Sequence, residues 1–324
     1  MKQAPAIASA LAVAALWLAA PARAQTQVQA TGEGEELAAA ERQPLASRSL
    51  LLDLHRLPDG RFLAVGERGH ILSSGDGREW TQAAYVPTRS TLTAVTGSGS
   101  TLWAAGHDTV ILRSEDGGER WTLLNFEPDR GQPIMDLYFR DADTGFAVGA
   151  YGLFMKTEDG GETWEEFFVS PDDWHLNGIE DLGDGRLVIS GEKGFGYVSD
   201  DGGETWVVIE LPYRGSMFGT TLADGCVIAY GLRGHVQRSC DRGESWEELS
   251  TPVENSLAGA ASRDGETVFV GNNGQVLVLE QDGRMRAEQH PSGVDFAAVV
   301  PLGGGQWLIV GEGGAHRFPA GAEG

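Results

Sequence analysis

Short apolar runs separated by glycine-rich polar stretches recur along the chain from about residue 50 to its end. In one stretch, residues 92–97 (LTAVTG) and 101–106 (TLWAAG) are largely apolar, residues 109–114 (TVILRS) alternate, and residues 120–126 (RWTLLNF) form a fourth run. Short runs with this period and these turn residues predict strands rather than helices. The pattern therefore predicts sets of four short antiparallel strands.

The second strand of each set is apolar on both faces. Residues 186–191 (RLVISG), 226–231 (CVIAYG) and 306–311 (QWLIVG) are examples. A strand without polar positions must be covered on both faces. Each small sheet is therefore expected to pack between two neighbours.

Two independent series give the period of the repeat. Tryptophans recur at 80, 121, 164, 206 and 246, with spacings of 41, 43, 42 and 40 residues. Ahead of them runs a series of glycines that begin Gly-x-x-Gly-like turns, at positions 66, 106, 149, 191, 231, 271 and 311. The glycine series counts seven units, two more than the tryptophans mark.

Seven units of about 42 residues, each with four strands, predict an all-β fold, a seven-bladed β-propeller of four-stranded antiparallel blades. The last unit has only three strand candidates before the chain stops. Residues 43–49 stand where the fourth strand of a preceding unit would lie. We therefore predict that this N-terminal segment adds a strand to the last blade and closes the ring.

The segment that ends at each tryptophan has the pattern S/T-x-D-x-G-x-x-W. It appears as SEDGGERW, TEDGGETW, SDDGGETW and SCDRGESW, ending at Trp121, Trp164, Trp206 and Trp246. The carboxylate can accept main-chain N–H bonds within a hairpin, while the glycine permits a backbone conformation that other residues disfavour. We predict a structural role for Asp116, Trp121, Asp159, Trp164, Asp201, Trp206, Asp241 and Trp246, and no catalytic one.

The pattern weakens at both ends of the repeat array. The first unit reads SSGDGREW, with Gly75 where the aspartate is expected, the sixth has no tryptophan, and the seventh lacks the pattern. Uneven copies fit a structural role better than seven catalytic centres.

The first 24 residues have the features of a secretory signal peptide. Lys2 supplies a positive charge, an apolar run follows, and Ala22-Arg23-Ala24 is a small-x-small cleavage signature. An uncleaved membrane anchor is the alternative, but the run is shorter than the ~20 residues that a spanning helix needs. We expect cleavage after Ala24, export to the periplasm, an acidic segment over residues 25–42 and a single propeller domain over residues 43–324.

Charge narrows the choice of partners. The formal net charge is −23, and removing Lys2 and Arg23 with the signal peptide makes it −25. Nucleic acids and anionic membrane surfaces would be repelled. We expect neither as a partner, and we expect a monomer.

In a propeller, the turns between strands two and three lie on the same face as the loops between blades. Several aromatic and cationic residues fall on these segments, and many of the interblade loops open with proline, which restricts their conformation. Acidic residues such as Asp172 and Glu192 fall there too, and a mixed field of this kind suits a protein partner. The alternative is a scatter of ordinary surface residues. The predicted partner-binding face consists of Arg68, Arg89, Arg130, Tyr151, Trp174, Lys193, Tyr213, Arg214 and Arg233.

The pattern of residues 145–164, GFAVGAYGLFMKTEDGGETW, resembles the Asp-box (BNR) repeats of the photosystem II stability and assembly factor family. The resemblance runs from about residue 43 to the C-terminus. It implies an exported propeller, without catalytic activity or cofactor, that uses one face to hold an assembly intermediate of a membrane protein complex.

Two other functions stay open. A glycoside hydrolase such as a sialidase would need three arginines, a tyrosine nucleophile and a Phe/Tyr-Arg-Ile-Pro segment, and this segment is absent. A glycan- or ligand-binding module is the other alternative. The seven histidines show no metal-ligand spacing, and we expect no metal. Calcium among the Asp-rich hairpins is a further open alternative.

Two cysteines remain, Cys226 in the second strand of the fifth unit and Cys240 just past its third strand. The turn lies midway between them, so the hairpin brings them close together. In an oxidising compartment we expect a disulfide, with two separate buried thiols as the alternative.

Overall fold

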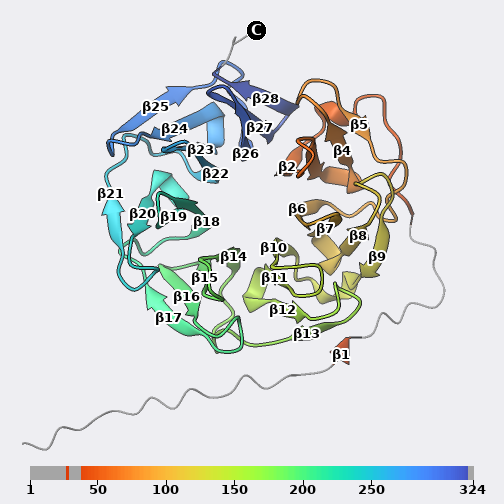
Figure 1. Cartoon of the computed structure of the whole chain (residues 1–324), viewed down its shortest axis with the longest axis horizontal. Helices are drawn as coiled ribbons and strands as arrows, with labels where there is room; N and C mark the ends of the chain where they lie inside the picture. Colours follow the sequence, from red (N-terminus) through yellow and green to blue (C-terminus); the bar gives the residue numbers. More distant parts are fainter. Residues whose placement is uncertain (1–26, 29–37, 320–324) are drawn as a thin grey trace, which may run out of the picture.

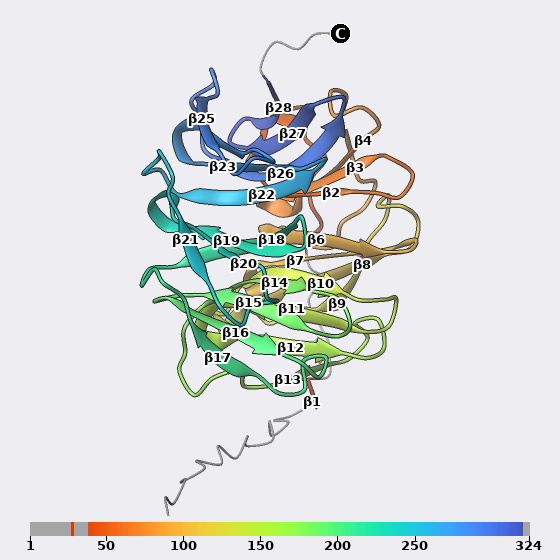
Figure 2. The same cartoon turned by 60° about the vertical axis from the view of Figure 1, so that its left-hand side comes forward.

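Seven antiparallel sheets surround a central axis in the computed structural model, which describes residues 27–28 and 38–319 (Figure 1). Each sheet runs outward from a first strand beside the axis, and successive sheets follow one another around the ring. This arrangement confirms the predicted seven-bladed β-propeller. Seen from the side, the blades stack face against face (Figure 2).

The strands of blades 1 to 4 follow the predicted units. Blade 1 holds β2 (Leu51–Arg56), β3 (Phe62–Gly66), β4 (Ile71–Ser74) and β5 (Thr81–Gln82). Blade 2 holds β6 (Leu92–Ser98), β7 (Thr101–Gly106), β8 (Ile111–Ser114) and β9 (Thr122–Asn125). Blade 3 holds β10 (Ile134–Phe139), β11 (Gly145–Gly149), β12 (Phe154–Thr157) and β13 (Trp164–Glu166). Blade 4 holds β14 (Leu176–Asp181), β15 (Leu187–Gly191), β16 (Phe195–Ser199) and β17 (Val207–Glu210).

The remaining strands complete the ring. Blade 5 holds β18 (Met217–Ala223), β19 (Cys226–Gly231), β20 (Val236–Ser239) and β21 (Glu247–Leu249). Blade 6 holds β22 (Leu257–Arg263), β23 (Glu266–Gly271), β24 (Gln275–Leu279) and β25 (Met285–Gln289). Blade 7 holds β26 (Phe296–Gly303), β27 (Gln306–Gly311) and β28 (Gly314–Phe318). The 3-10 turns are η1 (Ala46–Arg48), η2 (Glu67–Gly69), η3 (His107–Thr109), η4 (Pro128–Arg130), η5 (Ala150–Gly152), η6 (Leu232–Gly234) and η7 (Asn272–Gly274).

The hydrophobic core lies between blades, which explains why the second strands carry no polar face. Every residue of β3 and β11 is buried. Between blades 2 and 3, the Trp103 ring stacks on Phe139 with centroids 3.7 Å apart, and Phe139 meets Trp164 edge to face. Burial of apolar side chains in the seams, with aromatic pairs in some of them, supplies much of the stabilisation that holds neighbouring blades together.

Ring closure differs from the prediction of an added N-terminal strand. Among the described residues blade 7 is a three-stranded sheet, because residues 43–49 contain the turn η1 and no strand. Ala46 of η1 is buried against Leu308 and Val310 of β27, which seals the seam between blades 7 and 1. Arg317 of β28 also donates a hydrogen bond across this seam to the main-chain oxygen of Asp76. The ring therefore closes by packing and a side-chain contact. Pro44 fits this outcome, since proline cannot donate to a strand ladder.

A strand from the N-terminal region does pair with a blade, but at another place. Strand β1 (Gln27–Val28) adds to the outer edge of β13 in blade 3, with Gln27 opposite Glu165 (Figures 1 and 2). The predicted signal peptide, residues 1–24, and most of the acidic segment lie outside the described residues. Within residues 38–319, no helix is long and apolar enough to span a membrane.

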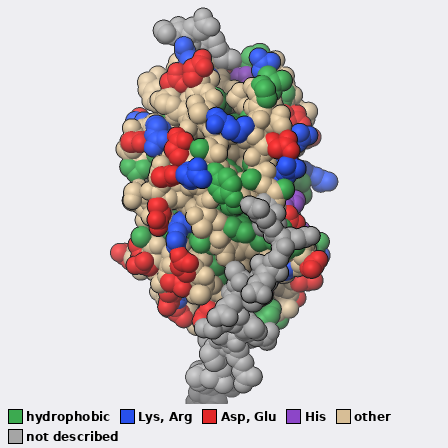
Figure 3. Space-filling view, turned by 90° about the vertical axis from the view of Figure 1, so that its right-hand side faces the viewer, with side chains coloured by type: hydrophobic (Ala, Val, Ile, Leu, Met, Phe, Trp, Pro, Cys, Tyr) green, Lys and Arg blue, Asp and Glu red, His purple; other side chains and the backbone are tan. Residues whose placement is uncertain are grey.

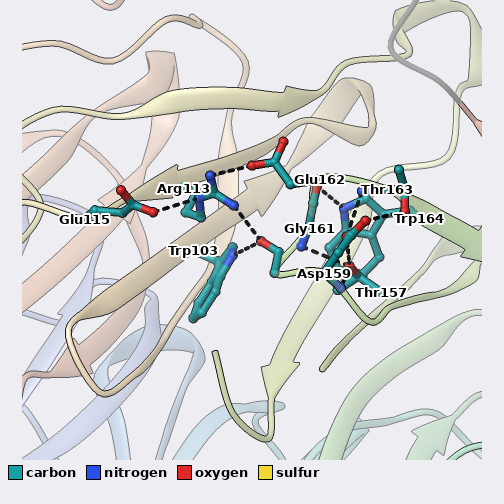
Figure 4. A network of polar contacts seen from close by, with 10 residues as sticks. Trp103, Arg113, Glu115, Thr157, Asp159, Gly161, Glu162, Thr163 and Trp164 are labelled. Atoms are coloured by element: carbon teal, nitrogen blue, oxygen red, sulfur yellow. Dashed lines mark hydrogen bonds and ion pairs between the residues drawn. The ribbon is translucent and has the colours of Figure 1, made fainter. Parts of the chain in front are cut away.

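The aspartate of each Asp-box binds groups of its own hairpin. In blade 3, Asp159 Oδ1 accepts hydrogen bonds from the Thr157 hydroxyl and from the Thr163 main-chain N–H, at 2.8 and 2.9 Å (Figure 4). The Trp164 indole N–H donates to the Gly161 oxygen at 3.1 Å. In blade 5, hydrogen bonds from the Ser245 hydroxyl and main chain lower the pKa of Asp241 to about 2. The hydrogen bonds of these carboxylates stay within their own hairpin, as a structural role requires.

The preceding blade also holds the Asp-box. Arg113 of blade 2 forms an ion pair with Glu162 at 2.6 Å and donates to the Gly160 oxygen, which the Trp103 indole N–H also contacts (Figure 4). Arg61 reaches the Gly117 oxygen from blade 1 in the same way. The Asp-box hairpins of blades 2 and 3 therefore also take part in contacts with the preceding blade.

Blade 1 corrects the expectation that its box lacks the aspartate. Ser74 Oγ accepts from Gly77 N at 2.8 Å, and Asp76 Oδ1 accepts from the N–H groups of Arg78 and Glu79. Asp76 therefore has the role of the box aspartate, and the segment from serine to tryptophan is one residue shorter than in blade 2. Alignment on Trp80 without a gap places Gly75 at that position, so the pattern by itself points to the wrong residue.

Cys226 and Cys240 form a disulfide, with their Cα atoms 4.2 Å apart. It links the start of β19 to the residue after β20. The bridge holds together the end of the hairpin that lies on the Asp-box side of blade 5.

Candidate partner-binding face

The turn between the second and third strands has the same unusual conformation in every blade. Its middle residue has a positive φ, between 55° and 60° at six positions, where L-residues are uncommon. In blade 7 the position is a glycine, Gly313. Because the backbone is fixed and the side chain varies, this position presents a ring of interchangeable side chains. They are Arg68, Asp108, Tyr151, Lys193, Arg233 and Asn273.

The residue after this position is a glycine in most blades, and there the turn contacts an interblade loop on the same face. A Cβ atom on Gly194 would lie 2.5 Å from the Tyr213 main-chain oxygen, and one on Gly69 would lie 2.3 Å from the Thr88 oxygen. Only glycine permits such close contact between turn and loop. Side chains from both segments therefore lie next to one another on this face.

Blades 3 to 5 bring aromatic, histidine and cationic side chains together. Tyr151 meets His175 edge to face at 4.9 Å, Lys193 Nζ lies 3.8 Å from the Trp174 ring centroid, and Tyr213 stacks on His235 at 3.5 Å. Each pair joins a turn to an interblade loop. We call this set, with Arg233, the blade 3–5 sector; it consists of Tyr151, Trp174, His175, Lys193, Tyr213, Arg233 and His235.

Exposure within the sector suits contact with another molecule. Tyr151 is 56% exposed, an unusual fraction for a large aromatic residue, and Lys193 and Arg233 are exposed. The Trp174 indole nitrogen is buried without a hydrogen-bond partner among the described residues. Arg233 and His235 also border a depression of about 540 Å³. Rigid aromatic groups with adjacent cations are typical of binding surfaces.

The other predicted residues of the face lie elsewhere or are already paired. Arg68 and Arg89 border a separate small cavity between blades 1 and 2, and Arg89 forms an ion pair with Glu41 at 2.7 Å. Arg130 is held between Glu127 and Glu166, and Arg214 pairs with Glu210. The structure thus gathers five of the nine predicted residues into one sector.

His175 and His235 belong to the sector although the sequence did not single them out. His235 follows the turn glycine Gly234, and His175 follows Trp174 in an interblade loop. Their positions next to predicted residues were the available signal. His175 Nδ1 lies 3.6 Å from Glu192, and His235 Nδ1 contacts Glu248, so carboxylates orient both rings.

The surface charge is mixed. On the side that carries blades 1 and 2, acidic and basic side chains are interspersed (Figure 3). On the sector's own face, Asp172 and Asp173 are exposed beside Trp174. This distribution favours a protein partner over a polyanion.

A second polar region, which the repeat pattern did not reveal, lies around the central axis. The first strands of the blades line a cavity of about 490 Å³. In each first strand the register with the second strand shifts after the first residue. The next paired residue, two positions further on, is Asp53 in blade 1, Asp136 in blade 3 and Gly or Ala in the others. The recurrence of this position in every unit was the signal by which the sequence could have revealed the two aspartates.

These aspartates connect neighbouring first strands. Asp53 Oδ2 accepts from Val95 N in blade 2 at 2.7 Å, and Asp136 Oδ2 accepts from Ile179 N in blade 4 at 2.9 Å. Burial raises the pKa of Asp53 to about 6, and burial together with the charge of Asp53 raises the pKa of Asp136 to about 7. Burial and the charge of Asp136 raise the pKa of Glu180, on β14, to about 8. These groups bind protons near neutral pH.

Within residues 38–319, no group of three or more histidine, cysteine or acidic side chains is arranged to hold a metal ion. The box carboxylates engage their own hairpins, and Asp53 and Asp136 of the central cavity bind main-chain N–H groups.

Fold and face together define a class, that of seven-bladed Asp-box propellers with an aromatic and cationic sector on the face opposite the boxes. The chain belongs to the photosynthesis system II assembly factor YCF48 family, whose model matches residues 129–293. No curated protein matches the sequence.

Solved structures share the fold. A structure of YCF48 bound to D1 peptide has a TM-score of 0.67 at 18% identity and covers 95% of this chain and 98% of its own. YCF48 from Cyanidioschyzon merolae has a TM-score of 0.65 at 16% identity, covering 86% and 98%. A streptogramin B lyase has a TM-score of 0.71 at 16% identity, covering 84% and 93%. At these identities the likeness concerns the fold, which both assembly factors and an enzyme use.

Proposed function

We propose that this protein is a non-catalytic assembly factor that holds a peptide segment of a membrane protein complex of the photosystem II type on its blade 3–5 sector. The observation that carries this proposal is the row of turn and loop side chains from Tyr151 to His235, positioned on rigid backbone beside one another. Family membership supports it, as does the solved structure of one relative, YCF48 bound to D1 peptide.

The physical character of the sector fits a peptide ligand. Aromatic rings supply apolar contact area with little loss of conformational entropy, while Lys193 and Arg233 are available to carboxylates. The neighbouring Asp172 and Asp173 favour a segment that also carries cations. Because the turns are fixed before binding, little ordering is needed when a partner docks.

Export is part of the proposal. The N-terminal 24 residues have the pattern of a signal peptide, and a disulfide fits an oxidising compartment. The mature protein, residues 25–324, then acts as a soluble monomer in the periplasm, with cleavage after Ala24. Amino-terminal sequencing of the protein isolated from its host tests this step.

Site-specific photo-crosslinking tests the partner. A photoreactive phenylalanine analogue at Tyr151 in the full-length chain is expected to crosslink an integral membrane subunit of a reaction-centre complex, identified by mass spectrometry. The same analogue at Arg120, on the opposite face, is the matched control. Recovery of the same products from both positions, or of soluble proteins alone, contradicts the proposal.

An enzyme assay covers the main alternative. Turnover of aryl-glycoside or sialoside reporters that disappears in an Asp136→Asn or Glu180→Gln variant would establish a glycosidase and overturn the non-catalytic proposal. Saturable glycan binding without turnover, unaffected by changes in the sector, would instead indicate a glycan-binding module.

A further inference from the structure

Blade 7 ends in an unpaired edge, which leaves room where every other blade has a fourth strand. Strand β28 pairs with β27 alone among the described residues. The Arg317 main-chain oxygen accepts a hydrogen bond from His290 Nε2, so the main-chain groups of Arg317 point away from β27. Since strand residues alternate, those of Ala315 point the same way. The Arg317 oxygen is already bound by His290, but the Arg317 N–H and both main-chain groups of Ala315 are available to another strand.

A groove of about 620 Å³ runs along this edge, from η1 to the Asp-box hairpin of blade 1. We call it the blade 7 groove. Residues 43–49 do not fill it, because η1 covers only the start of β28, where a Cβ on Gly314 would lie 2.0 Å from the Ser47 oxygen.

The groove is cationic although the chain has a net charge of −23. Its charged lining consists of Arg48, Arg78 and Arg317 with two histidines, and no acidic side chain lines it. Within residues 38–319, none of these three arginines forms an ion pair, whereas twelve other arginines do. The Asp76 carboxylate on the adjacent hairpin interacts with Arg317, but Arg48 and Arg78 have no ion-pair partner among the described residues, so the local field favours a negatively charged ligand.

Two buried donors in the groove have no acceptor. The Trp80 indole N–H and the Arg317 Nε–H are buried without a hydrogen-bond partner among the described residues. In blades 2, 3 and 5 the corresponding indole N–H donates to the box glycine, whereas Trp206 of blade 4, like Trp80, has no partner among the described residues. The unpaired indole of Trp80 therefore does not single out the groove, but the Arg317 Nε–H does, since buried donors are normally satisfied and this one lacks an acceptor among the described residues.

We infer that the blade 7 groove binds an extended acidic peptide segment of a partner protein, which adds to β28 as a fourth strand. Main-chain pairing with β28 supplies affinity, and carboxylates meet Arg48 and Arg78. An anionic headgroup would satisfy the arginines but not the strand edge, so a peptide is the ligand that uses both features. Strand β1 shows that an extended segment can add to the outer edge of a blade in this fold. This site is distinct from the blade 3–5 sector.

Fluorescence anisotropy tests the inference with the mature chain and a labelled peptide, acetyl-Glu-Val-Glu-Val-Glu-Val-amide. We expect saturable binding that falls at least tenfold in the double variant Arg48→Glu, Arg78→Glu. The matched control is Arg120→Glu, since Arg120 is exposed on the equivalent hairpin of blade 2 and also forms no ion pair among the described residues. An equal loss of affinity in the Arg120→Glu control would show that the effect comes from the net charge of the protein, and it would overturn the inference.

Two further probes separate strand addition from simple charge attraction. The same peptide N-methylated at alternate residues keeps its charge but cannot complete a ladder, and we expect it to bind at least tenfold more weakly. Equal binding of the methylated peptide contradicts strand addition. Truncation after Pro319 is expected to leave affinity unchanged, and a tenfold rise would show that residues 320–324 of this chain are the occupant instead. A Trp174→Ala variant should bind the peptide normally, which keeps this test independent of the proposed function.

Discussion

Lys193 Nζ lies 3.8 Å from the centroid of the Trp174 ring, so the turn of blade 4 covers an aromatic residue from the loop that precedes the blade. Both residues depend on the fixed geometry around them. Lys193 has a φ of 56°, and Gly194 beside it contacts the next interblade loop. The pair is therefore positioned before any partner arrives.

Trp174→Ala is expected to weaken partner binding about tenfold or more, because truncation removes a rigid aromatic contact and leaves Lys193 without its support. Lys193→Arg, which retains the cation and can stack on the ring, should bind nearly as well as the native protein. Quantitative recovery of the crosslinked partner measures both effects. Unchanged recovery with Trp174→Ala, at an unchanged melting temperature, would exclude the pair from the interface.

Asp159→Ala is expected to lower the free energy of unfolding by about 1–3 kcal/mol, because donors of the hairpin lose their acceptor. Urea denaturation measures the change. Glu254→Ala, at an exposed acidic position without an ion pair among the described residues, should stay within about 0.5 kcal/mol of the native value. An effect of Asp159→Ala on partner binding with stability unchanged would contradict the structural role of the box.

Stability is expected to rise as pH falls from 8.5 to 5.5. The folded-state pKa values of Asp53, Asp136 and Glu180, about 6, 7 and 8, lie above their ordinary values, so their contribution is fully present at low pH and lost as pH rises through 6 to 8. Urea midpoints at the two pH values measure the difference. Glu180→Gln should stabilise the protein at pH 8.5 and reduce the difference, whereas Glu254→Gln should not. A pH dependence that Glu180→Gln leaves intact would contradict this account.

The seam between blades 7 and 1 offers a direct test of closure without a strand. Ala46→Glu places a charge in the buried contact with Leu308 and Val310, and we expect a loss of roughly 3 kcal/mol or more in unfolding free energy. The neighbouring Leu45 is 63% exposed, so Leu45→Glu is a matched control with little expected effect. Equal melting temperatures for the two variants would show that η1 does not seal the ring.

Removing the disulfide by the double change Cys226→Ser, Cys240→Ser is expected to destabilise the protein by about 3 kcal/mol, the magnitude for a loop of some fifteen residues. Thermal unfolding with and without reductant measures the effect. The native protein should respond to reductant and the double variant should not. A native melting temperature that reductant leaves unchanged would contradict this expectation.

The repeat made much of the fold predictable. The spacing of the tryptophans and of the Gly-x-x-Gly-like turns indicated the number of blades, and the apolar second strands indicated their burial between neighbours. Two predictions were wrong, each at a place where the chain departs from the repeat. The box of blade 1 is one residue shorter than that of blade 2, so the pattern missed Asp76 as the box aspartate. Residues 43–49, with Pro44 and η1, do not form the expected closing strand.

The candidate site was less predictable. The sequence placed Tyr151, Trp174, Lys193, Tyr213 and Arg233 on one face, because turn and loop positions follow from the strand order. It offered no means of telling these from Arg130 and Arg214, whose ion pairs depend on side-chain geometry. His175 and His235 entered the site through ring contacts that no spacing encodes.

By itself, the sequence determined which segments become strands, how many blades form and which turns share a face, because these properties follow from local periodicity and from a repeat that each blade satisfies separately. The tertiary structure decided how the ring closes, which charged side chains remain unpaired and which carboxylates share the central cavity. Those properties depend on distances between residues of different blades, and only the packed ring sets those distances.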